Sequence, residues 1–326
     1  APAPPSAQRP DSVTCDRLKV WMKAADNGKV RIDKADAIGH VTAYQDGSEI
    51  SAKTVAVTFK AQPNKTDTAK SAATAKKSPK GGMFAMGRSG KVRASRVVAE
   101  GDVQVKYFDP KDSTREPLEV QCDYLNADLL TQLAAVGGKI DSKTGKVLKM
   151  AQIIQGKNSI TGGRIFFDQN GEAAKVEGPG ILVFHTRQDL SGNTLKASRA
   201  LKVTWQTSMI YHGNLGLGTF QGDVDLRSAG ELMQCSTLKL NFQSDDQTAR
   251  KERVKGRSLG LGLDTYSKRS LSSLEAIGGM GKTELALMRS TKFAPTNANW
   301  LQQRMELRGK TVFYEAASGN VRVTGK

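Results

Sequence analysis

Short alternations of apolar and polar residues recur along this chain in one form: an apolar residue, a spacer, a very small residue, two spacers and then further alternating apolar residues. The form occurs as VTCDRLKV from position 13, ISAKTVAV from 50, VRASRVVA from 92, VQCDYLNA from 120, ITGGRIFF from 160, MQCSTLKL from 233 and LRGKTVFY from 307. A period of two is typical of β-strands, whereas a helix requires apolar residues three and four positions apart. The recurrence therefore predicts an all-β protein built from repeated strands.

Two kinds of small residue punctuate these strands. The small position of the repeat holds Ala, Cys or Gly, which indicates a place where neighbouring strands or facing walls approach closely. A second element places Gly39, Gly101, Gly222 and Gly319 just before alternating valines. We expect these glycines to mark where strands resume after turns, with backbone angles that other residues avoid.

The two elements are joined in segments 160–178 (ITGGRIFFDQNGEAAKVEG) and 307–325 (LRGKTVFYEAASGNVRVTG). In both, an aromatic residue precedes an acidic one, as Phe167 and Tyr314 do, and Gly171 and Gly319 follow at the expected turn. The similarity predicts two copies of one hairpin.

Composition divides the chain further. Residues 1–11 are rich in Pro and Ser, lack the charged start and apolar core of a signal peptide, and are expected to form a flexible linker or processed terminus. The repeats assign 12–150 to a first β unit and 151–326 to a second. Residues 61–90 of the first unit are rich in Lys and poor in large apolar residues before Met83, which predicts a disordered basic insertion.

The net charge of +17 indicates attraction to a polyanion: nucleic acid, anionic lipid or acidic glycan. Aromatic residues form only 6% of the chain and do not alternate with the basic residues, as a groove for single-stranded nucleic acid would require. No nucleic acid is therefore expected as a partner. No apolar run is long enough for a membrane-spanning helix.

The residues that usually support catalysis do not form a recognisable set. Cys15, Cys122 and Cys235 all occupy the small position of the repeat, so we expect buried, unreactive thiols. Segment 276–287 (AIGGMGKTELAL) is similar to the end of a phosphate-binding loop, but Ala276 stands where that loop requires glycine. The sequence predicts a protein that is not an enzyme, with no metal and no cofactor.

The repeated unit, followed by a turn and a V-x-x-G-x-V segment, resembles the OstA-like (LptA) family of lipopolysaccharide-transport proteins. The resemblance rests on ISAKTVAV, VRASRVVAEGDVQV, VQCDYLNA and the two hairpin segments. It implies an open, twisted β-jellyroll of antiparallel strands, here two stacked jellyroll units, located in the periplasm or associated with the outer membrane. It also implies a non-catalytic role in which an apolar groove shields the acyl chains of lipopolysaccharide or another anionic acylated lipid, and edge strands pair with other β-jellyroll transport proteins.

The resemblance implies that the groove is lined by the alternating apolar residues that follow each small position or glycine. The candidate lipid-contacting residues are Val55, Val57, Phe59, Val103, Val105, Tyr107, Leu125, Ile165, Phe167, Leu238, Leu240, Phe242, Val312 and Tyr314. The same residues would fill a closed core in a structural or adhesive β-solenoid whose basic loops bind acidic polysaccharide. A polysaccharide-cleaving enzyme on a parallel β-helix would require clustered acidic residues, which the repeats lack.

Overall fold

The computed structural model describes residues 11–24, 30–45, 47–61, 92–108, 116–168, 170, 172–188, 194–228, 231–243, 270–279, 284–292, 303–315 and 320–325. All regular elements in these ranges are strands, which confirms the predicted all-β class. No described segment forms a helix that is long and apolar enough to cross a membrane. Most of the predicted basic insertion, the N-terminal ten residues, and the glycines at 171 and 319 lie outside the described residues.

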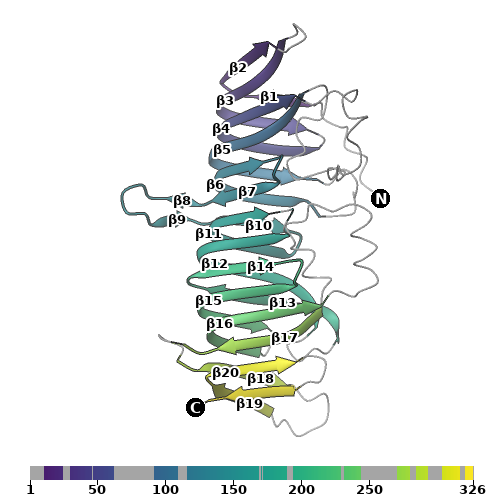
Figure 1. The fold of residues 1–326 in the computed structure, drawn as a ribbon, viewed down its shortest axis with the longest axis vertical. Coiled ribbons are helices and arrows are strands. Elements are labelled where there is room, and N and C mark those ends of the chain that lie inside the picture. The colour runs from purple at the N-terminus through teal and green to yellow at the C-terminus, as the bar shows by residue number, and fades with distance from the viewer. Residues whose placement is uncertain are drawn as a thin grey trace, which may run out of the picture. The chain divides into compact units, whose positions relative to one another are not determined.

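The chain divides into two compact units between Ala151 and Gln152. Whether each is an OstA-like unit stays a prediction. The strands of unit 1 are β1 (Ser12–Thr14), β2 (Arg17–Ala24), β3 (Val30–Gln45), β4 (Ser48–Ala61), β5 (Val92–Tyr107), β6 (Leu118–Asp128), β7 (Leu133–Gly137), β8 (Lys139–Ile140) and β9 (Val147–Lys149) (Figure 1).

Unit 2 contains the remaining strands. They are β10 (Ala151–Gln155), β11 (Asn158–Asp168), β12 (Ala173–Gln188), β13 (Thr194–Trp205), β14 (Ser208–His212), β15 (Leu217–Ser228), β16 (Glu231–Gln243), β17 (Ser270–Ile277), β18 (Ala286–Lys292), β19 (Gln303–Gly309), β20 (Thr311–Glu315) and β21 (Asn320–Thr324). Neighbouring strands pair antiparallel, as the jellyroll prediction requires.

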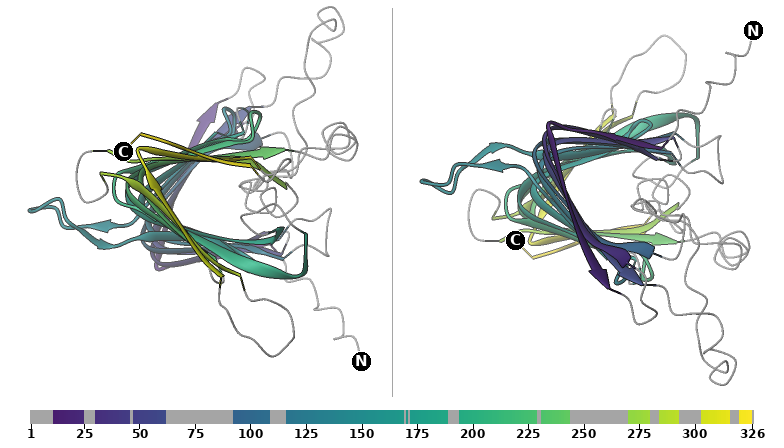
Figure 2. Two further views of the ribbon diagram at one scale, coloured as in Figure 1. Left: turned by 90° about the horizontal axis from the view of Figure 1, so that it is seen from below. Right: turned by 90° about the horizontal axis from the view of Figure 1, so that it is seen from above.

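Single strands of unit 2 run through two facing walls. β12 pairs with β14 over its first half and with β13 over its second half. Likewise, β15 pairs first with β14 and then with β13. Because β12 and β15 bend at the left-handed Gly178 and Gly222, between these two partners, each of the two strands belongs to both walls. Figure 2 shows the green and yellow strands of this unit in two layers that converge on one side.

Glycines form the bends where the walls meet. Gly39, Gly101 and Gly222 have φ values of 78°, 79° and 84°, and the residues that follow them, His40, Asp102 and Asp223, are also left-handed. The pairing register shifts at each site, as expected for β-bulges. The sequence interpretation was right about the unusual backbone angles but wrong about the position, because these glycines lie inside continuous strands and not after turns.

The small position of the repeat lies at the same corner. In unit 1, the residue after the small Ala52 is Lys53, whose Nζ is 3.2 Å from Asp102 Oδ2 at the bend of β5. The residue after Cys122 is Asp123, whose Oδ1 accepts a hydrogen bond from the Asp102 backbone N–H. The small residue thus turns one strand at the corner, and the polar residue after it meets the glycine bend of the next strand.

The corner of unit 2 shows why these positions tolerate little change. β13 and β14 are joined by Gln206 and Thr207 alone, and the bends of β12 and β15 flank this link. The Gly178 N–H donates to the Thr207 carbonyl at 2.8 Å, and the Gln206 N–H donates to the Gly222 carbonyl at 2.6 Å. Backbone hydrogen bonds therefore continue around the corner, so no polar group is lost where the sheet changes direction.

The two hairpin segments of the sequence have the same pairing. In 160–178, Ile165 pairs with Val176 across β11 and β12. In 307–325, Val312 pairs with Val323 across β20 and β21, at matching positions of the segment. Both hairpins therefore place an apolar pair on the inner face.

Candidate functional site

The first wall of unit 2 presents an unbroken apolar row to the interior. Cross-strand pairs connect β11, β12, β14, β15, β16, β17 and β20 in turn. The paired residues are Ile165, Val176, Met209, Phe220, Leu238, Ala276 and Val312. Each is at most 2% exposed. The row excludes water from one strand to the next along the whole wall.

A second row lies beside it, further from the corner. It consists of Phe167, Ala174, Tyr211, Gly218, Leu240, Leu274 and Tyr314, which pair in the same strand order. Large side chains alternate with the small Ala174 and Gly218. A Cβ added to Gly218 would lie 3.5 Å from Phe220 Cε2 and 3.8 Å from Tyr211 Cδ2, which is ordinary contact distance to both aromatic rings.

The facing wall of unit 2 is equally apolar. Its row runs through β11, β12, β13, β15, β16 and β18 and consists of Ile160, Leu182, Val203, Leu226, Met233 and Met288. Each is at most 2% exposed. None of these was among the sequence candidates, which in unit 2 all lie on the first wall. The sequence did contain a signal for this wall. Ile160 and Met233 are the first residues of their repeats and precede the small position, so they lie on the other side of the corner.

Two aromatic pairs connect the walls of unit 2. Near the corner, the rings of Trp205 and Phe220 have centroids 5.4 Å apart, and the Trp205 indole N–H donates to the Gly178 carbonyl. Further out, Phe184 of the second wall meets Phe242 of the first edge to face, with centroids 6.1 Å apart. Both pairs have geometries in which ring edges meet ring faces favourably.

Unit 1 contains a shorter interior of the same kind. Across β3 to β7, Ala37, Val55, Ala99, Leu125 and Val136 pair in one buried row. On the other side of the bends, Ile50, Val105 and Val120 form a second row. The sequence candidates of unit 1 therefore fall on both sides of the corner.

Burial separates the sequence candidates into two groups. Val57 and Phe59 are half-buried, and the other candidates are buried. Charged side chains are absent from the buried set within the described ranges, where the buried polar residues are Ser48, Ser95, Gln155 and Asn158. The buried candidates thus lie in the apolar interior of their own unit, and their contact with a lipid stays a prediction.

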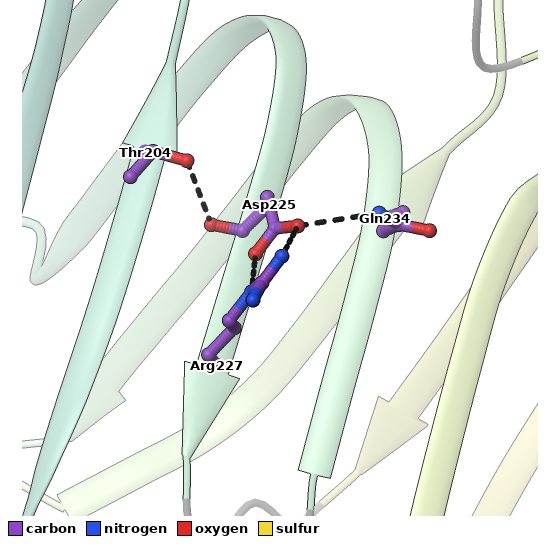
Figure 3. A network of polar contacts seen from close by, with 4 residues as sticks. All are labelled: Thr204, Asp225, Arg227 and Gln234. Carbon is purple, nitrogen blue, oxygen red and sulfur yellow. Dashed lines mark hydrogen bonds and ion pairs between the residues drawn. The ribbon is translucent and has the colours of Figure 1, made fainter.

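The outer faces of the walls are polar by contrast. In unit 2, the Asp225 carboxylate accepts hydrogen bonds from Arg227 Nε at 2.6 Å and Nη2 at 2.9 Å and from Gln234 Nε2 at 3.2 Å (Figure 3). The Arg227 guanidinium holds the pKa of Asp225 below its usual range, and Gln234 adds to the effect. The next strand pair carries Lys239 and Glu275, whose charged atoms lie 2.9 Å apart. One face of each strand is therefore built for water and the other for apolar groups.

The cysteines take no part in a chemical site. Cys122 and Cys235 are free and buried, and burial raises the pKa of each thiol to about 12. At neutral pH neither forms the nucleophilic thiolate. Cys15 is free and half-buried. In the part of the chain that the structure describes, no three His, Cys, Asp or Glu side chains gather as metal ligands.

Comparison with known proteins adds one structural likeness. No family model matches the sequence, and no curated protein matches it. Among solved structures, the chain is similar to the crystal structure of LptH, the LptA homologous periplasmic component of the conserved lipopolysaccharide transport device from Pseudomonas aeruginosa. The match has 13% sequence identity and a TM-score of 0.30, and it covers 59% of this chain and 94% of LptH. A TM-score of this size leaves the function to be argued from the residues of this chain.

Proposed function

We propose that this protein is a non-catalytic lipid-binding and bridging protein of the lipopolysaccharide-transport type. In this proposal the acyl chains of lipopolysaccharide, or of another anionic acylated lipid, lie between the two apolar walls, and the headgroup stays outside. The observation that carries the proposal is the pair of facing apolar rows in unit 2, which continue from strand to strand without a charged residue. The sequence resemblance to the OstA-like family supports it independently and implies a periplasmic site of action.

Entry of a lipid into this interior requires the two walls to separate. Buried rows of this kind stabilise the unit by about 1.5 to 3 kcal/mol for each large side chain removed from water. An acyl chain that replaces contacts between the walls keeps those side chains away from water, so separation of the walls around a lipid costs little of this stabilisation. Separation without a lipid would expose the rows and is unfavourable.

Photo-cross-linking tests the lipid contact directly. A benzoyl-phenylalanine placed at Leu240 points into the interior, whereas the same group at the adjacent Lys239 lies on the outer face. In a Gram-negative host we expect irradiation to attach lipopolysaccharide, or another acylated lipid identified by mass spectrometry, at Leu240 and not at Lys239. In a background with Trp21→Phe and Trp300→Phe, the emission of Trp205 checks that unit 2 folds in both variants. A folded protein that cross-links no lipid at Leu240 would favour the fully packed β-solenoid instead.

Bridging follows from the end strand of unit 1. In the described ranges β2 pairs with β3 alone, so its other edge carries backbone groups that can accept a further strand. Leu18 of β2 lies opposite the buried Ala37 and continues the apolar inner row, yet it is 53% exposed. A strand of another β-jellyroll added to β2 would extend the sheet and cover this residue.

A charged residue at this edge tests the bridge. We expect the parent chain to form larger assemblies with rising concentration in size-exclusion chromatography with light scattering, and Leu18→Lys to remain monomeric. Leu215→Lys is the control, because Leu215 is 69% exposed but lies in the turn between β14 and β15. Assembly that is equal in both variants would place the contact elsewhere, and a parent chain that stays monomeric would remove self-pairing from the proposal.

A further inference from the structure

The hairpin formed by β8 and β9 stands apart from the walls of unit 1. The two strands pair only with each other, in a sheet of their own. Figures 1 and 2 show the hairpin in teal projecting away from the long strands. Its turn is well built, because Asp141 Oδ1 accepts hydrogen bonds from the backbone N–H groups of Lys143 and Thr144 at 2.8 and 3.2 Å.

The fold does not need this hairpin to turn the corner. In unit 2, Gln206 and Thr207 alone connect β13 to β14 at a corner of the same kind. In unit 1, the chain leaves the wall at Gly138 and returns beside it, since a Cβ on Gly138 would collide with the Lys149 carbonyl oxygen and lie 2.9 Å from the Ala151 nitrogen. The entrance and exit of the hairpin are therefore adjacent, and the residues between them are surplus to the sheet.

The charges of the hairpin oppose its own stability. Lys139 pairs directly with Lys149, and like charges opposite each other destabilise a strand pair. Lys143 and Lys146 add two further exposed cations near the turn, while Asp141 is the hairpin's sole acidic residue and is held in the turn. Asp102 in the bend of β5 is near enough for Lys139 and Lys149 to help lower its pKa, but its carboxylate already pairs with Lys53. An anionic surface would therefore relieve the repulsion among the four lysines of the hairpin.

Apolar side chains accompany these lysines into water. Leu148 is 59% exposed and Ile140 is 37% exposed, although both belong to strands. Lysines that surround exposed apolar residues are the combination that binds the interface of an anionic bilayer: the cations meet lipid phosphates and the apolar groups enter the boundary of the acyl region. An acidic protein surface would satisfy the lysines but would leave Leu148 without an apolar environment.

We propose that the β8–β9 hairpin docks unit 1 onto the surface of an anionic lipid bilayer, with Lys139, Lys143, Lys146 and Lys149 on the phosphates and Leu148 in the headgroup boundary. This role is separate from the carriage of lipid between the walls, because it uses the outside of the molecule. It gives the protein a defined contact with a membrane through residues that neither apolar row contains.

Vesicle binding tests the proposal. We expect the full chain to sediment with vesicles of equal parts phosphatidylcholine and phosphatidylglycerol and not with phosphatidylcholine alone. Each lysine near such a surface contributes about fivefold in affinity, so replacement of the four hairpin lysines by Gln should weaken binding more than about tenfold after screening. The substitution Leu148→Ser should also weaken vesicle binding, although it leaves the net charge unchanged.

Two controls keep the test decisive. Replacement of the exposed Lys157, Lys196, Lys202 and Lys310 by Gln changes the net charge equally and should leave binding almost intact. A variant in which residues 139–149 are replaced by a Gln-Thr link should remain folded, judged by circular dichroism and urea unfolding of the full chain, and should bind as weakly as the hairpin Gln variant. Undiminished binding by either hairpin variant, equal loss in the unit 2 control, or no binding by the parent chain would overturn the proposal. Lipid cross-linking at Leu240 should persist in the hairpin variants, so failure of one proposal is distinguishable from failure of the other.

Discussion

Gly222→Ala tests whether the corner of unit 2 depends on a glycine bend in β15. At a φ of 84°, alanine costs about 1 to 2 kcal/mol relative to glycine, and the smaller entropy of the unfolded chain returns about 0.4 to 1 kcal/mol. The new Cβ would also collide with Thr207 Oγ1 and lie 2.8 Å from the Thr207 nitrogen. Overpacking of this kind adds about 1 to 3 kcal/mol. The expected loss in the free energy of unfolding is thus about 2 to 4 kcal/mol.

Gly178→Ala is the matched control within the same unit. Gly178 has a φ of 79° and lies in the bend of β12, but a Cβ there would meet nothing within 4 Å. This variant experiences the backbone strain alone, so we expect a loss of about 0.5 to 1 kcal/mol. The difference between the two variants isolates the collision with Thr207.

The assay is urea unfolding followed by the emission of Trp205, which is 1% exposed inside unit 2. A background with Trp21→Phe and Trp300→Phe leaves this side chain as the only tryptophan, so the transition reports unit 2 and not the whole chain. Combination of Gly222→Ala with Thr207→Ala should recover part of the loss, because it removes the Oγ1 contact. Equal destabilisation by Gly222→Ala and Gly178→Ala would refute the proposed close approach at this corner.

Two further predictions concern single side chains. In the native protein, a thiol reagent should modify Cys15 and should reach Cys122 and Cys235 only after urea is added, as monitored by absorbance; rapid native labelling of all three would contradict their burial. Arg227 lowers the pKa of Asp225 in the folded protein. The ion pair therefore stabilises the fold fully at pH values above the pKa of an unfolded Asp, near 3.9, and this stabilisation is lost as the pH falls through the lower pKa of the folded state. At pH 7 the parent should be more stable than Asp225→Asn by less than about 1 kcal/mol, because Arg227 is 66% exposed. The difference, measured by urea unfolding, should vanish in strong acid. A difference that persists in strong acid would have another cause than the ion pair.

The sequence was sufficient to predict the strands because each inner face leaves a period-two signal that does not depend on tertiary context. It was also sufficient to identify small positions as places of close approach, since a Cβ on Gly162 or Gly309 would collide with a valine of another strand. It did not show that a small position and a glycine bend of the same unit, such as Cys122 and Gly101 in unit 1, meet at a corner, because their contact joins residues of different strands. The interpretation of the glycines as turn residues was wrong for that reason.

The candidate site was predicted on only one wall of unit 2 for a related reason. A residue before the small position, such as Met233, and one after it, such as Leu238, look equivalent in a linear alternation, but the bend sends them to opposite walls. The β8–β9 hairpin was missed because Ile140 and Leu148 are too few to produce an alternation. Its exposed lysines are also indistinguishable in sequence from those of an ordinary solvated loop.

The corner of unit 2 and the contact between Phe184 and Phe242 differ in how easily the two walls can separate. At the corner, the walls are connected by the backbone hydrogen bonds of Gly178 and Gly222 and by the hydrogen bond from the indole N–H of Trp205. These bonds fix the distance between the walls, because lengthening them would leave buried polar groups unpaired. Away from the corner, Phe184 and Phe242 meet through ring surfaces, which an apolar chain can replace at little cost. A fixed corner combined with an apolar contact that a lipid chain can replace supports the proposed carriage of acyl chains over a purely structural sandwich, which has no need of a replaceable contact.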